Sequence, residues 1–262
     1  MYQLGIDVGT SSVKLALLLD EHIERTWIKR HHGRLLQTVT EGLEAIQPPD
    51  EPIPVAVTGA NAQILTSRFD GIDRLGDIPA IVEGVRHAIP EAGSIIDSGG
   101  QGARYITTLK SGVPDCNVNA HCAGGTGSFF EDQMSRLGLK IEDYSELTAK
   151  AQSIPRLSGR CAVFAKTDII HRQQEGVSTP DILLGLCYAM IRNYKATIVK
   201  NLPVEKPVVF TGGVTLNAGA VRAVRNVFGL TGEELRIPDN ALFLGAIGCA
   251  LKAARGFLRG SA

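Results

Sequence analysis

The spacing of apolar and polar positions along the chain predicts short strands that alternate with helices. Residues 2–7 and 12–19 are apolar and β-prone on either side of Gly9-Thr-Ser-Ser12, a pattern that predicts a β-hairpin with a glycine near its tip. Further strands are expected at 22–30 and 54–57. A chain that mixes such strands with helices belongs to the α/β class.

Helical spacing of apolar residues recurs along the chain. It predicts helices at 34–46, 78–89, 126–137, 142–152, 164–175, 180–200, 217–227 and 240–251. A second β run at 93–97 repeats the order seen at the N-terminus, namely a strand, an acidic residue, glycines and a further strand at 104–109. A buried strand is expected at 207–210. Two matching units in one chain suggest an internal duplication, and hence two similar lobes.

Charge and cysteine content exclude several classes of protein. The chain has 262 residues with 27 basic and 27 acidic side chains, so no overall field favours nucleic acid or an anionic membrane surface as a partner. It shows no secretory leader and no run of about 18 apolar residues, so we expect a cytoplasmic protein. Five cysteines form an odd and sparse set, which argues against a disulfide framework and leaves free thiols or metal ligands.

Three glycine-containing turns each follow an apolar strand: Asp7-Val-Gly-Thr-Ser-Ser-Val-Lys14, Asp97-Ser-Gly-Gly-Gln101 and Thr211-Gly-Gly-Val-Thr-Leu-Asn217. Glycine lets backbone N–H groups approach phosphate oxygens, because no Cβ is in the way. Asp7 and Asp97 at two strand ends suit Mg²⁺, and Lys14 suits a phosphate. One such turn alone is more often structural. Neither a GxxxxGK[ST] nor a complete GxGxxG motif is present, so a P-loop and a standard dinucleotide fold are not supported.

These three segments resemble the phosphate-1, phosphate-2 and adenosine motifs of the actin, sugar kinase and Hsp70 ATPase superfamily. The resemblance implies two duplicated RNase H-like lobes with mixed five-stranded sheets, a nucleotide cleft between them, and crossing helices near 78–89 and 240–252. Lobe I would contain residues 1–76 and 241–262, and lobe II residues 77–240.

Two further segments resemble a narrower branch, the BadF/BadG/BcrA/BcrD-type ATPases that activate 2-hydroxyacyl-CoA dehydratases and benzoyl-CoA reductases. They are Asn119-Ala-His-Cys-Ala-Gly-Gly-Thr-Gly127 and Gly159-Arg-Cys-Ala-Val-Phe-Ala-Lys-Thr-Asp168. The resemblance implies that Cys122 and Cys161 ligate a [4Fe–4S] cluster. Such a cluster usually takes four cysteines, so two chains of a homodimer would share it. It also implies an iron–sulfur dehydratase or reductase as partner, and ferredoxin or flavodoxin as electron donor.

The same resemblance implies a set of site residues for ATP or ADP with Mg²⁺. Asp7 and Asp97 would hold Mg²⁺ and its waters, and Gln101 would orient the attacking water. The expected nucleotide contacts are Gly9, Thr10, Ser11, Ser12, Lys14, Gly99, Gly100, Gly125, Thr126, Gly127, Gly212, Gly213, Val214 and Asn217. The helices that follow the two cysteines would offer free N–H groups to the cluster.

Two alternatives remain open at this stage. A small-molecule kinase of the same superfamily would need a carboxylate base, for which Asp77, Glu83 and Asp168 are the candidates. A nucleotide-sensing subunit with a vestigial cluster is suggested by Gly102, because many relatives have aspartate there. The turn Thr58-Gly-Ala-Asn-Ala62 also departs from the glycine-aromatic-glycine-basic pattern of the relatives. The other cysteines, Cys116, Cys187 and Cys249, are expected to be small buried hydrophobes, Cys116 with the least support.

Overall fold

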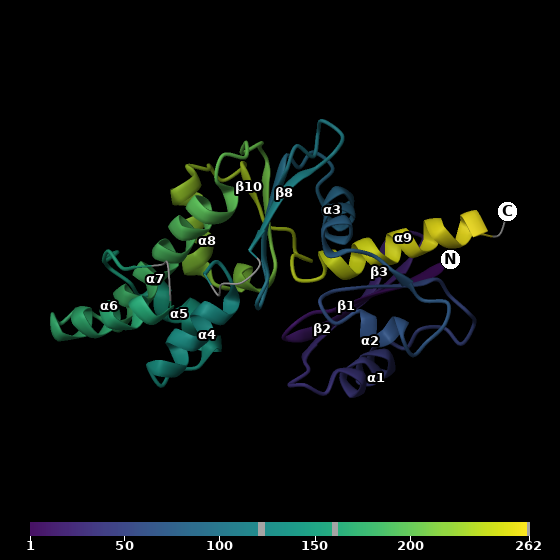
Figure 1. The fold of residues 1–262 in the computed structure, drawn as a ribbon, viewed down its shortest axis with the longest axis horizontal. Coiled ribbons are helices and arrows are strands. Elements are labelled where there is room, and N and C mark those ends of the chain that lie inside the picture. The colour runs from purple at the N-terminus through teal and green to yellow at the C-terminus, as the bar shows by residue number, and fades with distance from the viewer. Residues whose placement is uncertain (120–123, 159–161, 261–262) are drawn as a thin grey trace. The chain divides into compact units, whose positions relative to one another are not determined.

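The computed structural model describes residues 1–119, 124–158 and 162–260, which form two compact units. Unit 1 contains Met1–Glu91 and the segment that begins at Pro238, and unit 2 contains Ala92–Ile237. Each unit is built around one five-stranded sheet with helices packed against it (Figure 1).

The sheet of unit 1 has the strand order β3-β2-β1-β4-β5. Its strands are β1 (Tyr2–Val8), β2 (Ser12–Leu19), β3 (His22–Arg30), β4 (Val55–Thr58) and β5 (Asp73–Arg74). The first three strands are antiparallel, whereas β4 pairs parallel to β1 and β5 parallel to β4. The predicted hairpin and the two strands after it are therefore confirmed. The short edge strand β5 was not predicted, because two residues carry no periodicity.

The sheet of unit 2 repeats this topology with the order β10-β9-β6-β7-β8. Its strands are β6 (Ser94–Ser98), β7 (Ala103–Thr107), β8 (Asp115–Asn119), β9 (Val208–Thr211) and β10 (Leu235–Arg236). Here too the first three strands in sequence are antiparallel and the other two join parallel. The predicted duplication and the mixed five-stranded sheets are confirmed.

Helices α3 and α9 pack against each other within unit 1. The helices of this unit are α1 (Leu35–Ile46), α2 (Gln63–Thr66), α3 (Asp77–Ala88) and α9 (Leu244–Gly260). A Cβ at Gly84 would lie 2.0 Å from the Leu244 carbonyl oxygen, and one at Gly248 would lie 1.9 Å from that of Ala80. Only glycine permits this approach of the two backbones. This packing places α3 in unit 1, whereas the sequence led us to expect a boundary after residue 76.

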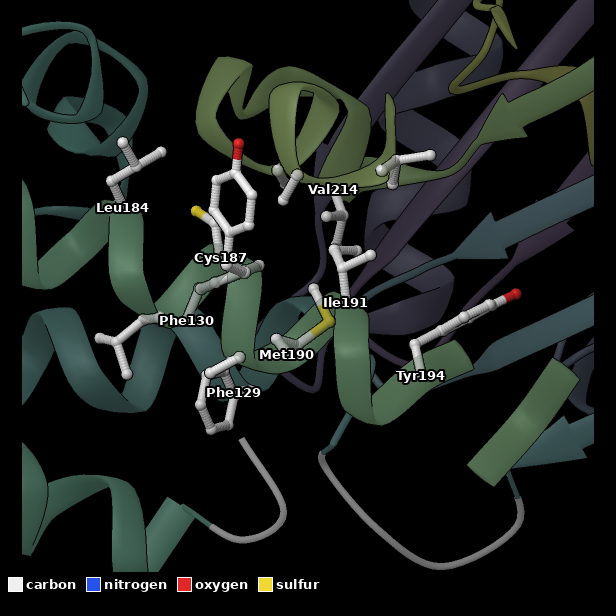
Figure 2. Packing of buried hydrophobic residues seen from close by; sticks show 14 of the residues in the cluster. Phe129, Phe130, Leu184, Cys187, Met190, Ile191, Tyr194 and Val214 are labelled. Atoms are coloured by element: carbon white, nitrogen blue, oxygen red, sulfur yellow. The ribbon is translucent and has the colours of Figure 1, made fainter. Parts of the chain in front are cut away.

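Unit 2 has a helical core centred on α7. Its helices are α4 (Gly127–Arg136), α5 (Tyr144–Ala149), α6 (Ala162–Gln174), α7 (Thr179–Tyr194) and α8 (Ala218–Phe228), with 3₁₀ turns at Ile141–Asp143 and Gly213–Leu216 and a π-helical turn at Lys195–Val199. Ser178 caps α7 by accepting a hydrogen bond from the Asp181 N–H. Figure 2 shows Phe129 and Phe130 of α4 beside Met190 of α7, all of them buried.

None of the helices in the described part of the chain has the length and apolar character needed to cross a membrane.

Candidate functional site

The phosphate-1 segment of unit 1 forms the tight connection between β1 and β2. The Gly9 N–H donates to the Ser12 carbonyl (3.0 Å), which closes the turn. Asp7 and Lys14 face each other across the hairpin, and Lys14 Nζ lies 2.8 Å from Asp7 Oδ2. The predicted metal ligand and the predicted phosphate ligand are thus brought together as an ion pair. A phosphate or a cation that binds at this turn would therefore lie next to both the Lys14 ammonium and the Asp7 carboxylate.

The turn after β4 supports this hairpin. Gly59 has a φ of +98°, and a Cβ there would lie 2.4 Å from the Val8 carbonyl oxygen. Asn61 Nδ2 donates to the Gly9 carbonyl (2.8 Å), so its side chain fixes the phosphate-1 turn. Sequence reasoning noticed that residues 58–62 depart from the pattern of the relatives but missed this role of Asn61.

The phosphate-2 segment of unit 2 contains a second ion pair in the equivalent place. Arg104 Nη1 lies 2.7 Å from Asp97 Oδ2, and the two residues are partners across the β6–β7 hairpin. Arg104 follows Asp97 by the same spacing that separates Lys14 from Asp7. This repeated spacing was visible in the sequence, and it would have identified Arg104.

A buried tyrosine supports the strand that carries Arg104. The Tyr194 hydroxyl donates to the Arg104 carbonyl. Burial, and next the nearby Asp97 carboxylate, raise the pKa of Tyr194 well above its ordinary value, so the hydroxyl keeps its proton and remains a donor.

The phosphate-2 loop is tied to the start of α4. The Gly127 N–H donates to the Gly99 carbonyl and the Ser128 N–H to the Gly100 carbonyl, both at 2.8 Å. In addition, Ser98 Oγ donates to the Gly125 carbonyl (2.6 Å). Two segments predicted to bind nucleotide are therefore joined to each other. The expectation that the first N–H groups of this helix are free is wrong for Gly127 and Ser128.

Gln101 and Gly102 complete this loop. Gln101 is exposed, and its expected role in orienting water stays a prediction. A Cβ at Gly102 would lie 3.3 Å from the guanidinium nitrogens of Arg104. Position 102 thus lies against the ion-pair partner of Asp97.

The predicted adenosine segment follows β9. Gly212 has a φ of +91°, and a Cβ there would lie 2.4 Å from the Ser98 carbonyl oxygen. Val214 is buried in the core of unit 2 (Figure 2), and Asn217 Oδ1 caps α8 by accepting from the Ala220 N–H (3.1 Å). Gly213 has open space around it. Of these residues, Gly213 is the most accessible, whereas Val214 and Asn217 stabilise the fold.

Cys122, Cys161 and His121 lie outside the described residues. Among the described residues, no group of three or more His, Cys, Asp or Glu side chains is placed to hold a metal ion. Cys187 and Cys249 are buried, as predicted. Burial raises the pKa of the Cys187 thiol to about 12 and raises that of Cys249 as well, so both thiols stay protonated near neutral pH. Cys116, in β8, is only partly buried.

The three carboxylates proposed for a kinase base are each held in structural contacts. Asp77 Oδ1 accepts from the Gly59 N–H (3.1 Å), and Asp168 Oδ2 accepts from the Ser158 N–H (2.6 Å). Glu83 on α3 pairs with Arg255 (2.6 Å) and Lys252 (3.2 Å) on α9. These contacts favour roles in positioning backbone and helices over proton abstraction.

Comparison with known proteins places this geometry in a family. Residues 4–253 match the model of the BadF/BadG/BcrA/BcrD ATPase family. The chain is 31% identical over 258 residues to the activator of lactoyl-CoA dehydratase from Anaerotignum propionicum, covering 97% of both chains. It is 28% identical over 258 residues to the (R)-2-hydroxyglutaryl-CoA dehydratase activating ATPase from Acidaminococcus fermentans, again with 97% of both covered.

A solved structure agrees with these matches. The activator of the 2-hydroxyisocaproyl-CoA dehydratase from Clostridium difficile, with bound ADPNP, superposes with a TM-score of 0.88 at 25% identity, covering 100% of this chain and 97% of that one. The match over nearly the whole chain, together with the duplicated sheets, shows that the chain belongs to the BadF/BadG/BcrA/BcrD ATPase family.

Proposed function

We propose that this ATP-hydrolysing protein is an activator that transfers single electrons to an iron–sulfur enzyme of the 2-hydroxyacyl-CoA dehydratase or benzoyl-CoA reductase type. The named relatives that activate such dehydratases support the class of partner. Two hydrogen bonds support the coupling of nucleotide to redox chemistry: the Gly99 and Gly100 carbonyls of the phosphate-2 loop accept the first N–H groups of α4, the helix that follows Cys122.

Cys122 and Cys161 would hold a [4Fe–4S] cluster between two copies of the chain. Thiolates are the usual ligands of such clusters, and two from each chain of a homodimer complete the set of four. The described residues fit this role, because α6 begins at Ala162, directly after Cys161, and a helix N-terminus stabilises a thiolate. When bound, the cluster supplies one-electron chemistry between a ferredoxin or flavodoxin donor and the partner enzyme.

The residues of the duplicated hairpins would bind the nucleotide phosphates and Mg²⁺. Asp7 and Asp97 occupy equivalent places at the ends of β1 and β6, and carboxylate oxygens are ligands that suit Mg²⁺. Lys14 would balance the charge of the phosphates, and Gln101 would orient the attacking water. Gly213 would leave room for the adenosine.

Nucleotide binding drives a change only if two arrangements of the chain bind it with different affinity. We propose that the phosphate-2 loop provides this difference, because a shift of the Gly99 and Gly100 carbonyls must move the first turn of α4 or break its hydrogen bonds. The start of α4 would carry the change to the segment that contains Cys122.

The iron and sulfide content of anaerobically purified protein, with EPR after dithionite reduction, tests the cluster. We expect iron and a reduced-cluster signal in the wild type and their loss in both Cys122→Ala and Cys161→Ala. Cys116→Ser is the matched control and should retain them, since this cysteine is close in sequence but is not a proposed ligand. Wild-type protein without iron, or iron retained in both alanine variants, would refute the assignment.

Gly102 favours one second candidate, a nucleotide-sensing subunit that does not drive electron transfer. ATP hydrolysis measured with and without dithionite separates the two. An activator should hydrolyse ATP at a rate that changes with the redox state, whereas a sensor should bind ATP with little turnover in either state.

A further inference from the structure

An apolar pocket lies on the face of the unit 1 sheet that carries α1 and α2 (Figure 1). It has a volume of about 640 Å³, and its lining is apolar except for one threonine and one arginine. Leu4 and Ile6 of β1 and Val55 of β4 form its floor, while α1 and the segment 65–72 form its walls. Sites for small molecules have volumes of about 300–1,000 Å³ and combine a mostly apolar lining with a few polar groups. This pocket has both properties, and its residues lie outside the three nucleotide motifs.

The duplication of the fold explains why this face of the sheet is open. Between β9 and β10 unit 2 has α8, a helix of 11 residues, whereas between β4 and β5 unit 1 has α2, a helix of only 4 residues. Val208 of β9 is 0% exposed and belongs to the same core as Ala220 and Val224 of α8. Val55 holds the equivalent place in β4, yet it is only half-buried. The pocket therefore lies where a shorter helix leaves part of the sheet uncovered.

Several side chains of the lining remain partly in contact with water. Leu36 and Leu43 of α1 and Ile72 before β5 pack against the core of unit 1 but are only half-buried. Phe69, which also lines the pocket, is 53% exposed. Removing apolar surface from water is favourable roughly in proportion to its area. A hydrocarbon chain between α1 and the segment 65–72 would cover these four side chains together.

Arg68 determines the charge that such a ligand needs. It is the one ionisable residue of the described lining, and it is exposed, so its guanidinium lies at the rim of the pocket. Within the described ranges this guanidinium takes part in no hydrogen bond or ion pair. A guanidinium binds a carboxylate through two parallel N–H···O hydrogen bonds, and its single charge balances the single charge of that group. A phosphate group carries about −1.5 to −2 at neutral pH and would need a second basic residue, which the described lining does not contain.

We propose that this pocket binds a monocarboxylic acid with a hydrocarbon chain, with the carboxylate at Arg68 and the chain on the floor formed by β1 and β4. The proposal rests on unit 1 alone and is independent of the cluster and of electron transfer. Ile6 lines the pocket and directly precedes Asp7, the proposed Mg²⁺ ligand. A bound acid would therefore contact the strand that carries this carboxylate.

Calorimetric titration of the anaerobically purified protein with decanoate, kept below the concentration at which it forms micelles, tests the site. We expect one decanoate per chain in the wild type. Octanoate should bind about tenfold more weakly, because two CH₂ groups are lost from the apolar contact. Decanol has the same chain length without the charge. Arg68→Gln should weaken the binding of decanoate about tenfold or more but leave that of decanol unchanged. Arg192→Gln, at an exposed arginine of unit 2, is the matched control and should leave the binding of both probes unchanged.

A variant that fills the pocket tests its position. Thr40 is an exposed lining residue of α1, so Thr40→Trp places a large side chain over the pocket without disturbing the core, and it should weaken decanoate binding at least about tenfold. The matched control is Ala45→Trp, since Ala45 is exposed on α1 outside the lining, and it should bind decanoate like the wild type.

The titrations have clear contrary outcomes. Absence of decanoate binding, or binding as tight in Arg68→Gln or in Thr40→Trp as in the wild type, overturns the proposal. A loss of decanol binding in Arg68→Gln as large as the loss of decanoate binding also overturns it, because the arginine would then not act on the carboxylate. None of these results depends on iron content, so the proposed function stands or falls separately.

Discussion

The Asp97–Arg104 pair makes a prediction that separates stability from activity. Asp97→Asn removes the carboxylate but leaves the Arg104 guanidinium in place. The two side chains are 8% and 21% exposed, so the pair is largely buried. Breaking a buried ion pair from one side costs about 3–5 kcal/mol, and the residual solvent contact of Arg104 places this case near 2–3 kcal/mol. We expect a Tm roughly 5–10 °C lower for Asp97→Asn.

A double variant tests the reasoning. In Asp97→Asn with Arg104→Met the guanidinium charge that has lost its Asp97 partner is removed as well, so stability should recover by at least about half of the loss. ATP hydrolysis should stay low in both variants, because Asp97 is the proposed Mg²⁺ ligand. The assays are thermal unfolding by circular dichroism and phosphate release. The reasoning fails if Asp97→Asn melts like the wild type, or if the double variant is no more stable than Asp97→Asn.

Three further changes test other parts of the structure. Glu83→Gln should weaken the α3–α9 ion pairs and lower the unfolding free energy by about 1–2 kcal/mol. ATP hydrolysis per folded molecule should be retained. Loss of hydrolysis would instead support the alternative in which Glu83 is the base of a kinase. Gly212→Ala should lower the free energy of unfolding in urea by roughly 2 kcal/mol or more, because its Cβ would clash with the Ser98 carbonyl. Gly229→Ala, where φ is also positive but the space is open, should lower it by about 1 kcal/mol. Equal losses would contradict the clash at Gly212. Iodoacetamide at pH 8 should label Cys116 in the folded protein and Cys187 only after unfolding, because burial raises the pKa of Cys187 to about 12. Labelling is followed by mass spectrometry. Fast labelling of Cys187 in the folded protein would show that its helix opens.

The sequence predicted elements with strong periodicity and missed those whose residues carry none. The β1–β2 hairpin was predicted because apolar residues fill both strands. Strand β8 (Asp115–Asn119) was missed, because it lies at the edge of its sheet, pairs with β7 only, and carries mostly polar residues with no apolar alternation. The helix expected at 180–200 is α-helical only to Tyr194, and the wider turn at Lys195–Val199 has no local signature.

The candidate site was predictable in its parts but not in its contacts. Glycines and aspartates at strand ends indicated phosphate and Mg²⁺ chemistry. The two hydrogen bonds that join the Gly99–Gly100 loop to α4 link segments far apart in sequence and depend on tertiary packing. The backbone partners of Asp77 and Asp168 were equally invisible, which is why both residues remained candidate bases until the structure was known.

Native mass spectrometry under anaerobic conditions tests the central claim most directly. The account predicts that the wild-type chain appears as a dimer that carries one [4Fe–4S] cluster, and that Cys122→Ala loses the cluster mass. An iron-free wild type, or a cluster carried by a single chain, would contradict it.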